Sequence, residues 1–123
     1  MTITNGIVVN GREETGHVVV PKGVTAIGDH AFMFSEMKSI ELPRTLTSIG
    51  YCSFSNCCNL RRLIIPDGVT EISYGAFSEC KNLEYIVVPS AVRSLLTGDK
   101  FSHCKKLKKI IVTISFDVSG CYI

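Results

Sequence analysis

Residues 63–86, LIIPDGVTEISYGAFSECKNLEYI, decide the fold, because their pattern of apolar residues, proline and phenylalanine recurs along the whole chain. The four prolines are 22, 23 and 23 residues apart, and a phenylalanine follows each of them after 11 or 12 residues. These residues are Pro21, Pro43, Pro66 and Pro89, followed by Phe32, Phe54, Phe77 and Phe101. Two registers that recur together indicate internal repeats of about 23 residues.

Further apolar positions follow the same period. Aliphatic residues stand three and six positions after each proline: Val24 and Ile27, Leu46 and Ile49, Val69 and Ile72, Val92 and Leu95. A pair of alternating apolar residues closes each repeat: Val18/Val20, Ile40/Leu42, Leu63/Ile65, Ile86/Val88 and Ile110/Val112. Alternation predicts strands with one buried face. Proline then ends each strand because it has no N–H to donate to a ladder.

The remaining third of each repeat, such as residues 73–83, has apolar spacing that fits a short helix or a series of turns. A single 23-residue coil cannot bury its own apolar side, whereas stacked coils can. The sequence therefore predicts a β-rich repeat solenoid with short helical or turn segments: about four coils whose parallel strands line a concave sheet. We divide it into a capping strand and turn at 1–17, four to five repeats at 18–112, and a strand or truncated repeat at 113–123.

At this point the pattern resembles a known family. Residues 63–86 are similar to the BspA-like leucine-rich repeat, and residues 18–110 carry four copies, about three quarters of the chain. The resemblance implies a microbial protein, often at the cell surface, that acts as an adhesin or a protein-binding module. Two departures stand out: one extra residue near 97–99, and Thr113 where a proline is expected.

The two ends differ from the repeats. Residues 1–17 contain two turn-forming Asn-Gly pairs, and we expect residues 7–9 to form a capping strand beside residues 18–20. Residues 110–118 alternate in a way that predicts one long terminal strand. Its open edge would invite self-association, strengthened by salt because salt screens the lysines nearby. The alternative is that the chain is a piece of a longer array.

Composition excludes several classes. The chain has 123 residues, 46% of them hydrophobic, and a formal net charge of +2. It contains neither a signal peptide nor an apolar run long enough to span a membrane. No nucleophile motif, phosphate loop or zinc-protease pair occurs, and His17, His30 and His103 have no motif partner. We therefore predict no catalytic residue, no enzyme activity and no cofactor.

Six cysteines permit two kinds of site. Zinc would need paired ligands, but Cys57, Cys80 and Cys104 recur at the repeat period instead of forming knuckles. Disulfides are disfavoured because side chains in register keep their Cβ atoms ~4.8 Å apart, beyond the ~3.8 Å that a disulfide prefers. We predict a column of buried thiols and no metal, with Cys52, Cys58 and Cys121 as the more reactive cysteines. Free thiols point weakly to the cytoplasm, in contrast to the cell surface that the resemblance implies.

Charge is distributed unevenly. Residues 100–123 carry net +4, mostly from the KKLKK run at 105–109, and residues 1–99 carry −2. This run has two interpretations. It is either a binding site for an acidic partner, anionic lipid or nucleic acid, or simply a solvated end of the solenoid. We favour the solvated end and expect no nucleic acid, because no aromatic residues interleave with the lysines.

The residues that alternate with the buried pairs should point outward. They form two columns: Val19, Glu41, Ile64, Val87 and Ile111, then His17, Ser39, Arg62, Tyr85 and Lys109. An aliphatic stripe flanked by Arg62, Tyr85 and Lys109 is typical of interfaces, although β-branched residues suit any strand. The strip would cover ~200 to 300 Å², against ~800 Å² per partner in a standard interface. We therefore expect weak or multivalent binding of a protein partner, or else a structural spacer with no ligand.

Overall fold

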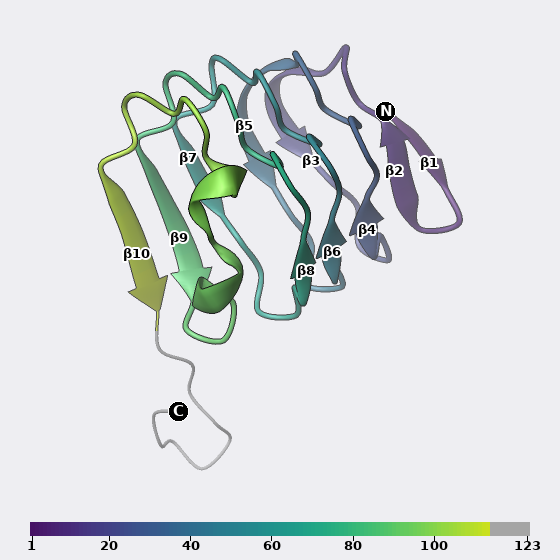
Figure 1. Ribbon diagram of the computed structural model, residues 1–123. Helices are drawn as coiled ribbons and strands as arrows, with labels where there is room; N and C mark the ends of the chain where they lie inside the picture. The colour runs from purple at the N-terminus through teal and green to yellow at the C-terminus, as the bar shows by residue number, and fades with distance from the viewer. Residues whose placement is uncertain (114–123) are drawn as a thin grey trace.

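The computed structural model describes residues 1–113, which form a solenoid of five coils, one more than the approximate prediction (Figure 1). The solenoid has two strand-bearing faces. Each coil contributes one strand to the first, which we call the long-strand face, and shorter strands line the second, which we call the short-strand face. The long-strand face contains β3 (Thr15–Val19), β5 (Glu36–Glu41), β7 (Arg62–Ile64), β9 (Tyr85–Pro89) and β10 (Lys109–Thr113). The short-strand face contains β1 (Thr2–Thr4), β2 (Ile7–Asn10), β4 (Ala26–Ile27), β6 (Ser48–Ile49) and β8 (Glu71–Ile72).

A stack of phenylalanine rings runs through the centre of the solenoid. Phe32, Phe54 and Phe77 are fully buried, and successive ring centroids from Phe32 to Phe101 lie 5.3, 5.6 and 5.5 Å apart. The rings are nearly parallel, as stacking of identical positions requires. This column confirms the register that the sequence predicts, in which Phe77 contacts Phe54 and Phe101.

The stack ends at its N-terminal side on a glycine. A Cβ at Gly11 would lie 2.2 Å from Cε1 of Phe32, so the ring occupies the space that a side chain would need. The amide of Gly11 also donates to the carbonyl of Ala31 at 2.7 Å. Gly11 therefore closes the aromatic column.

The segments between the two faces are turns. Within residues 1–113 there is no α-helix, only two 3-10 turns, η1 (Arg93–Leu95) and η2 (Gly98–Lys100), so of the two predicted alternatives residues 73–83 adopt turns. The second residue after each phenylalanine has a left-handed backbone, at Phe34, Asn56, Glu79 and His103. That conformation is uncommon outside glycine and asparagine. Its recurrence shows that the stacking of the coils, and not the residue type, imposes it.

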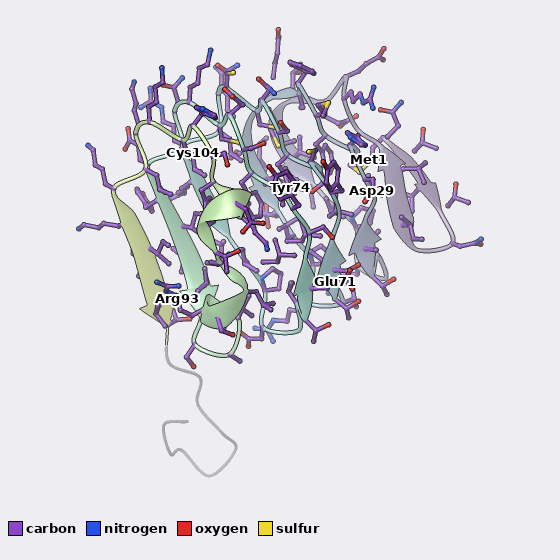
Figure 2. The ribbon with its side chains drawn as sticks, viewed as in Figure 1. Met1, Asp29, Glu71, Tyr74, Arg93 and Cys104 are labelled. Atoms are coloured by element: carbon purple, nitrogen blue, oxygen red, sulfur yellow. The ribbon has the colours of Figure 1, made fainter. Side chains whose placement is uncertain are left out.

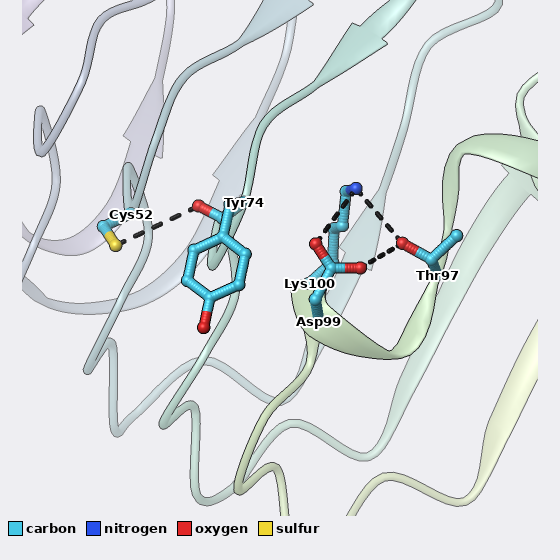
Figure 3. A network of polar contacts seen from close by, with 5 residues as sticks. All are labelled: Cys52, Tyr74, Thr97, Asp99 and Lys100. Atoms are coloured by element: carbon cyan, nitrogen blue, oxygen red, sulfur yellow. Dashed lines mark hydrogen bonds and ion pairs between the residues drawn. The ribbon is translucent and has the colours of Figure 1, made fainter.

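The extra residue near 97–99 is accommodated by η2. Lys100 Nζ donates to Thr97 Oγ1 at 3.1 Å and pairs with Asp99 Oδ2 at 3.3 Å, and the Thr97 hydroxyl donates to Asp99 (Figure 3). The carbonyl of Asp99 accepts from the amide of Gly75 in the preceding coil. The hydrogen bond from Thr97 lowers the pKa of the Asp99 carboxyl. The lengthened turn is therefore tied both to itself and to its neighbour.

The N-terminal strand exists, but its predicted position is wrong. β2 pairs in parallel with β4 and antiparallel with β1, so it lies on the short-strand face and not beside β3. Asn5 and Gly6, both with positive φ, form the turn of the β1–β2 hairpin. A hairpin needs its partner strand next in sequence, and β1 supplies the pairing that would otherwise leave β2 as an open edge.

At the other end, β10 pairs with β9 and, within residues 1–113, with no second strand. Val112, predicted to face inward, is 43% exposed, and Ile110 is only half-buried, because no described coil covers them. Most of the predicted terminal strand lies outside the described residues. Self-association through this end therefore stays a prediction.

Candidate protein-binding face

The predicted outward columns lie in register on the long-strand face. Val19 pairs with Glu41, Ile64 with Val87, and Val87 with Ile111. In the second column His17 pairs with Ser39, and Tyr85 lies between Arg62 and Lys109. Val19, Ile64 and Ile111 are 55%, 57% and 40% exposed, whereas Val87 and Tyr85 are half-buried. The face thus presents aliphatic side chains to solvent beside Arg62 and Lys109.

The long-strand face is divided into two sheets. β3 pairs with β5, and β9 pairs with both β7 and β10, but among the described residues no ladder joins β5 to β7. The break falls where a short repeat meets regular ones: residues 32–43 span one residue fewer than residues 54–66. A separate register shift, between Gly16 and His17, lies within the β3–β5 ladder, where β5 has one residue more than β3. Glu41 and Ile64 therefore lie in consecutive coils with no ladder between their strands, and both line the cleft described next.

An open cleft of about 350 Å³ lies across the break. Its walls are mainly aliphatic and come from the carboxyl ends of β5, β7 and β9, with Arg44 and Asp67 beside them. The aliphatic lining residues are Ile40, Leu42, Ile64, Ile65, Val87 and Val88. A second cleft of about 290 Å³ adjoins Val19, Leu42 and Pro43. Such apolar concavities accept apolar side chains of a partner.

A polar cluster interrupts the aliphatic stripe at its N-terminal end. His17 Nε2 lies 2.6 Å from Glu41 Oε2, and His17 Nδ1 lies 2.6 Å from Ser39 Oγ. The neutral ring satisfies both contacts when Nε2–H donates to Glu41 and Ser39 donates to Nδ1. Sequence motifs missed this cluster, since its members are 22 and 24 residues apart. Alignment of the repeats does bring them together, because they occupy adjacent coils.

The cysteines form the predicted column. Cys57, Cys80 and Cys104 donate to the carbonyls of Phe32, Phe54 and Phe77 at 3.1, 3.1 and 3.0 Å. All five described cysteines are free thiols. Burial raises the pKa of Cys57 to about 12, and a hydrogen bond with Cys104 together with burial raises that of Cys80. Cys57 and Cys80 are therefore poor nucleophiles, whereas the hydrogen bond with Cys80 lowers the pKa of Cys104, which is only partly buried.

The thiols predicted to be more reactive lie elsewhere. Cys52 is partly exposed and its Sγ lies 4.0 Å from the carbonyl oxygen of Tyr74 (Figure 3), but desolvation raises its pKa. Cys58 is partly exposed, and Cys121 lies outside the described residues. Within the described part of the chain, no group of three or more His, Cys, Asp or Glu side chains is arranged to hold a metal ion.

Thiol labelling should separate the two sets. With iodoacetamide at neutral pH, we expect Cys57 and Cys80 to react slowly in the folded protein and fully in denaturant, since both are buried with raised pKa values. Cys58, which is partly exposed, should react faster than these two and serves as the internal reference. Mass spectrometry would count against the thiol column if Cys57 reacted as fast as Cys58 or formed a bridge with Cys80.

Comparison with known proteins identifies the family. Residues 11–122 match the model of the BspA type leucine-rich repeat region, with six copies. The chain therefore belongs to the BspA-type leucine-rich repeat family, as the sequence resemblance implied. A comparison with curated proteins gives no match. Among the described residues no helix is long and apolar enough to cross a membrane.

Solved structures share the fold. The pneumococcal vaccine antigen PcpA is 22% identical with a TM-score of 0.68, covering 78% of this chain and 24% of that one. A leucine-rich cell surface protein from Faecalibacterium prausnitzii is 26% identical with a TM-score of 0.63, covering 88% of this chain and 34% of that one. A leucine-rich repeat protein from Bacteroides ovatus is 29% identical with a TM-score of 0.50, covering 80% of this chain and 31% of that one. The chain thus spans about a quarter to a third of each of these structures.

Proposed function

We propose that this chain is a non-enzymatic, protein-binding module of a cell-surface protein, and that it recognises its partner through the long-strand face. The observation that carries the proposal is an aliphatic group, exposed at Ile64 and Ile111 and half-buried at Val87, which lies in register beside Arg62, Tyr85 and Lys109. Aliphatic residues bordered by tyrosine and arginine are the composition of interface centres. The F. prausnitzii relative, itself a cell surface protein, supports the location.

The apolar cleft refines the expected partner. Because the sheet is open between β5 and β7, a partner side chain of leucine or phenylalanine size can enter beside Ile64 and reach Leu42. Arg44 and Asp67 at the same cleft offer charged groups for the partner's backbone or flanking side chains. The face is small relative to a standard interface, so binding by this segment alone should be weak, and strong binding requires several repeats or several copies.

A structural spacer is the second candidate. It is favoured by the length of the similar structures, which are about 2.6 to 3.3 times as long as this chain and so offer other segments for a ligand site. As a spacer, the chain would bind nothing through Ile64, and its aliphatic residues would reflect only the strand preference of β-branched side chains.

A single substitution distinguishes the two candidates. We expect Ile64→Lys to abolish capture of a partner from extracellular extracts on immobilised protein, because a lysine at the cleft leaves its charge against an apolar partner surface. Tyr74→Lys is the matched control: Tyr74 is 56% exposed but belongs to the turn beyond β8. Both variants should keep the wild-type melting temperature. Equal capture by wild type and Ile64→Lys would favour the spacer.

A further inference from the structure

A second exposed surface lies along the edge where the turns lead into the long strands. We call it the basic ridge, and its cations are Lys38, Arg61, Arg62, Lys81, Lys105, Lys106, Lys108 and Lys109. The segments that carry these eight cations, residues 36–38, 61–62, 81–84 and 105–109, contain two carboxylates, Glu36 and Glu84, so the ridge segments carry net +6. The rest of the chain, with five cations and nine carboxylates, carries −4. Nitrogen-tipped side chains gather at the upper left of the molecule, above the loops that lead into β9 and β10 (Figure 2).

The ridge is ordered by the repeat. Backbone hydrogen bonds from Glu84 to Arg61 and from Lys108 to Glu84, both 2.7 Å, align these three residues in consecutive coils. The eight cations are exposed, and none of them forms an ion pair with a residue in the described part of the chain. Concentrating unpaired like charges raises the electrostatic energy of the folded protein unless an anion is bound.

One part of the ridge has the form of a binding site. A cleft of about 350 Å³ is lined by Lys38, Asn59, Arg61 and Asn82. The Asn59 amide donates to the carbonyl of Glu36 at 3.3 Å, and the Asn82 amide donates to that of Cys58 at 2.7 Å. These bonds fix both amides and leave their carbonyl oxygens without a hydrogen-bond donor in the described residues. The cleft therefore combines two cations with two fixed acceptors.

We propose that the basic ridge binds a linear sulfated polysaccharide. Sulfate groups pair with the cations, and sugar hydroxyls donate to the free oxygens of Asn59 and Asn82. The cations extend along the solenoid axis, from Lys38 in the second coil to Lys106 in the fifth, over ~14 Å at ~4.8 Å per coil. This direction matches an extended polymer better than a single anion.

Two other polyanions fit the ridge less well. Single-stranded nucleic acid is held by aromatic side chains on which its bases stack. Among the described residues, the aromatic side chain that lies between two ridge cations is Tyr85, between Arg62 and Lys109, and it is half-buried. An anionic bilayer is bound most firmly when apolar side chains insert next to the cations. Phe34, 66% exposed, adjoins Asn59 at the Lys38 end of the ridge, but among the described residues no apolar side chain of comparable exposure accompanies the lysines at 105–109.

The test is titration calorimetry with heparin oligosaccharides at low salt. We expect binding that weakens steeply as salt rises, and about a tenfold loss in Lys38→Gln/Arg61→Gln. Lys22→Gln/Arg93→Gln removes the same charge from exposed positions elsewhere and should change the affinity less than twofold. All of these residues are exposed, so an unchanged melting temperature confirms that each variant is folded. Arg62 and Lys109 belong to both surfaces, but neither variant alters them or Ile64, so this outcome is independent of the proposed protein partner.

Three results would overturn the proposal. One is equal weakening by the two variants, which would mean that net charge alone governs binding. Another is undiminished affinity for desulfated heparin. The third is tighter binding to a single-stranded oligonucleotide, or to phosphatidylserine vesicles, than to heparin at the same salt, which would assign the ridge to nucleic acid or to membrane lipid.

Discussion

Phe77→Ala is expected to lower the free energy of unfolding by about 3 to 5 kcal/mol. Phe77 is fully buried, and its ring is stacked between Phe54 at 5.6 Å and Phe101 at 5.5 Å. Neighbouring rings cannot close the cavity without separating the coils, because each ring position is fixed by its own coil. Since small domains are stable by ~5 to 15 kcal/mol, the variant should be close to unfolding at 37 °C.

Chemical denaturation with a matched phenylalanine provides the check. Phe34 is 66% exposed, so Phe34→Ala should change the stability by less than about 0.5 kcal/mol. A Phe77→Ala protein that unfolds at the wild-type denaturant concentration would show that the aromatic column does not hold the coils together.

Gly11→Ala is expected to lower the stability by about 1 to 3 kcal/mol, although it adds only one methyl group. The new Cβ would lie 2.2 Å from Cε1 and 2.5 Å from Cδ1 of the Phe32 ring. That ring is fully buried and stacked on Phe54 at 5.3 Å, so it cannot move aside without leaving the column. The N-terminal coil should therefore loosen first.

Gly98→Ala is the control for this effect. A Cβ at Gly98 meets no atom within 4 Å, so thermal unfolding of Gly98→Ala should follow the wild type. If Gly11→Ala also melted like the wild type, the first coil would have to leave space beside Phe32, and the assigned end of the column would be incorrect.

The repeat period predicts most of the fold because it acts on every coil alike. Positions such as Val69 and Leu83 are buried in each repeat by the same neighbours one coil away, so aligning the repeats is equivalent to stacking them. The outward positions follow from the two-residue alternation of each strand. The columns containing Ile64 and Tyr85 were therefore accessible from the sequence, although their binding role is a proposal.

Features that depend on exceptions to the period were not accessible. β2 belongs to the short-strand face because it forms a hairpin with β1, and no repeat position encodes that pairing. The break between β5 and β7 falls at a one-residue difference in repeat length, and the sequence does not say whether such a difference ends the ladder. The left-handed backbone at Phe34 and Glu79 carries no sequence signal, since neither residue type favours it.

Hydroxyl-radical footprinting of the protein alone and with its captured partner is the most direct test of recognition through the long-strand face. We predict that oxidation of Ile64 and Tyr85 falls in the complex, while that of Tyr51 and Tyr74, which are 42% and 56% exposed in the turns after β6 and β8, stays unchanged. Protection of Tyr51 and Tyr74 with undiminished oxidation of Ile64 and Tyr85 would contradict it.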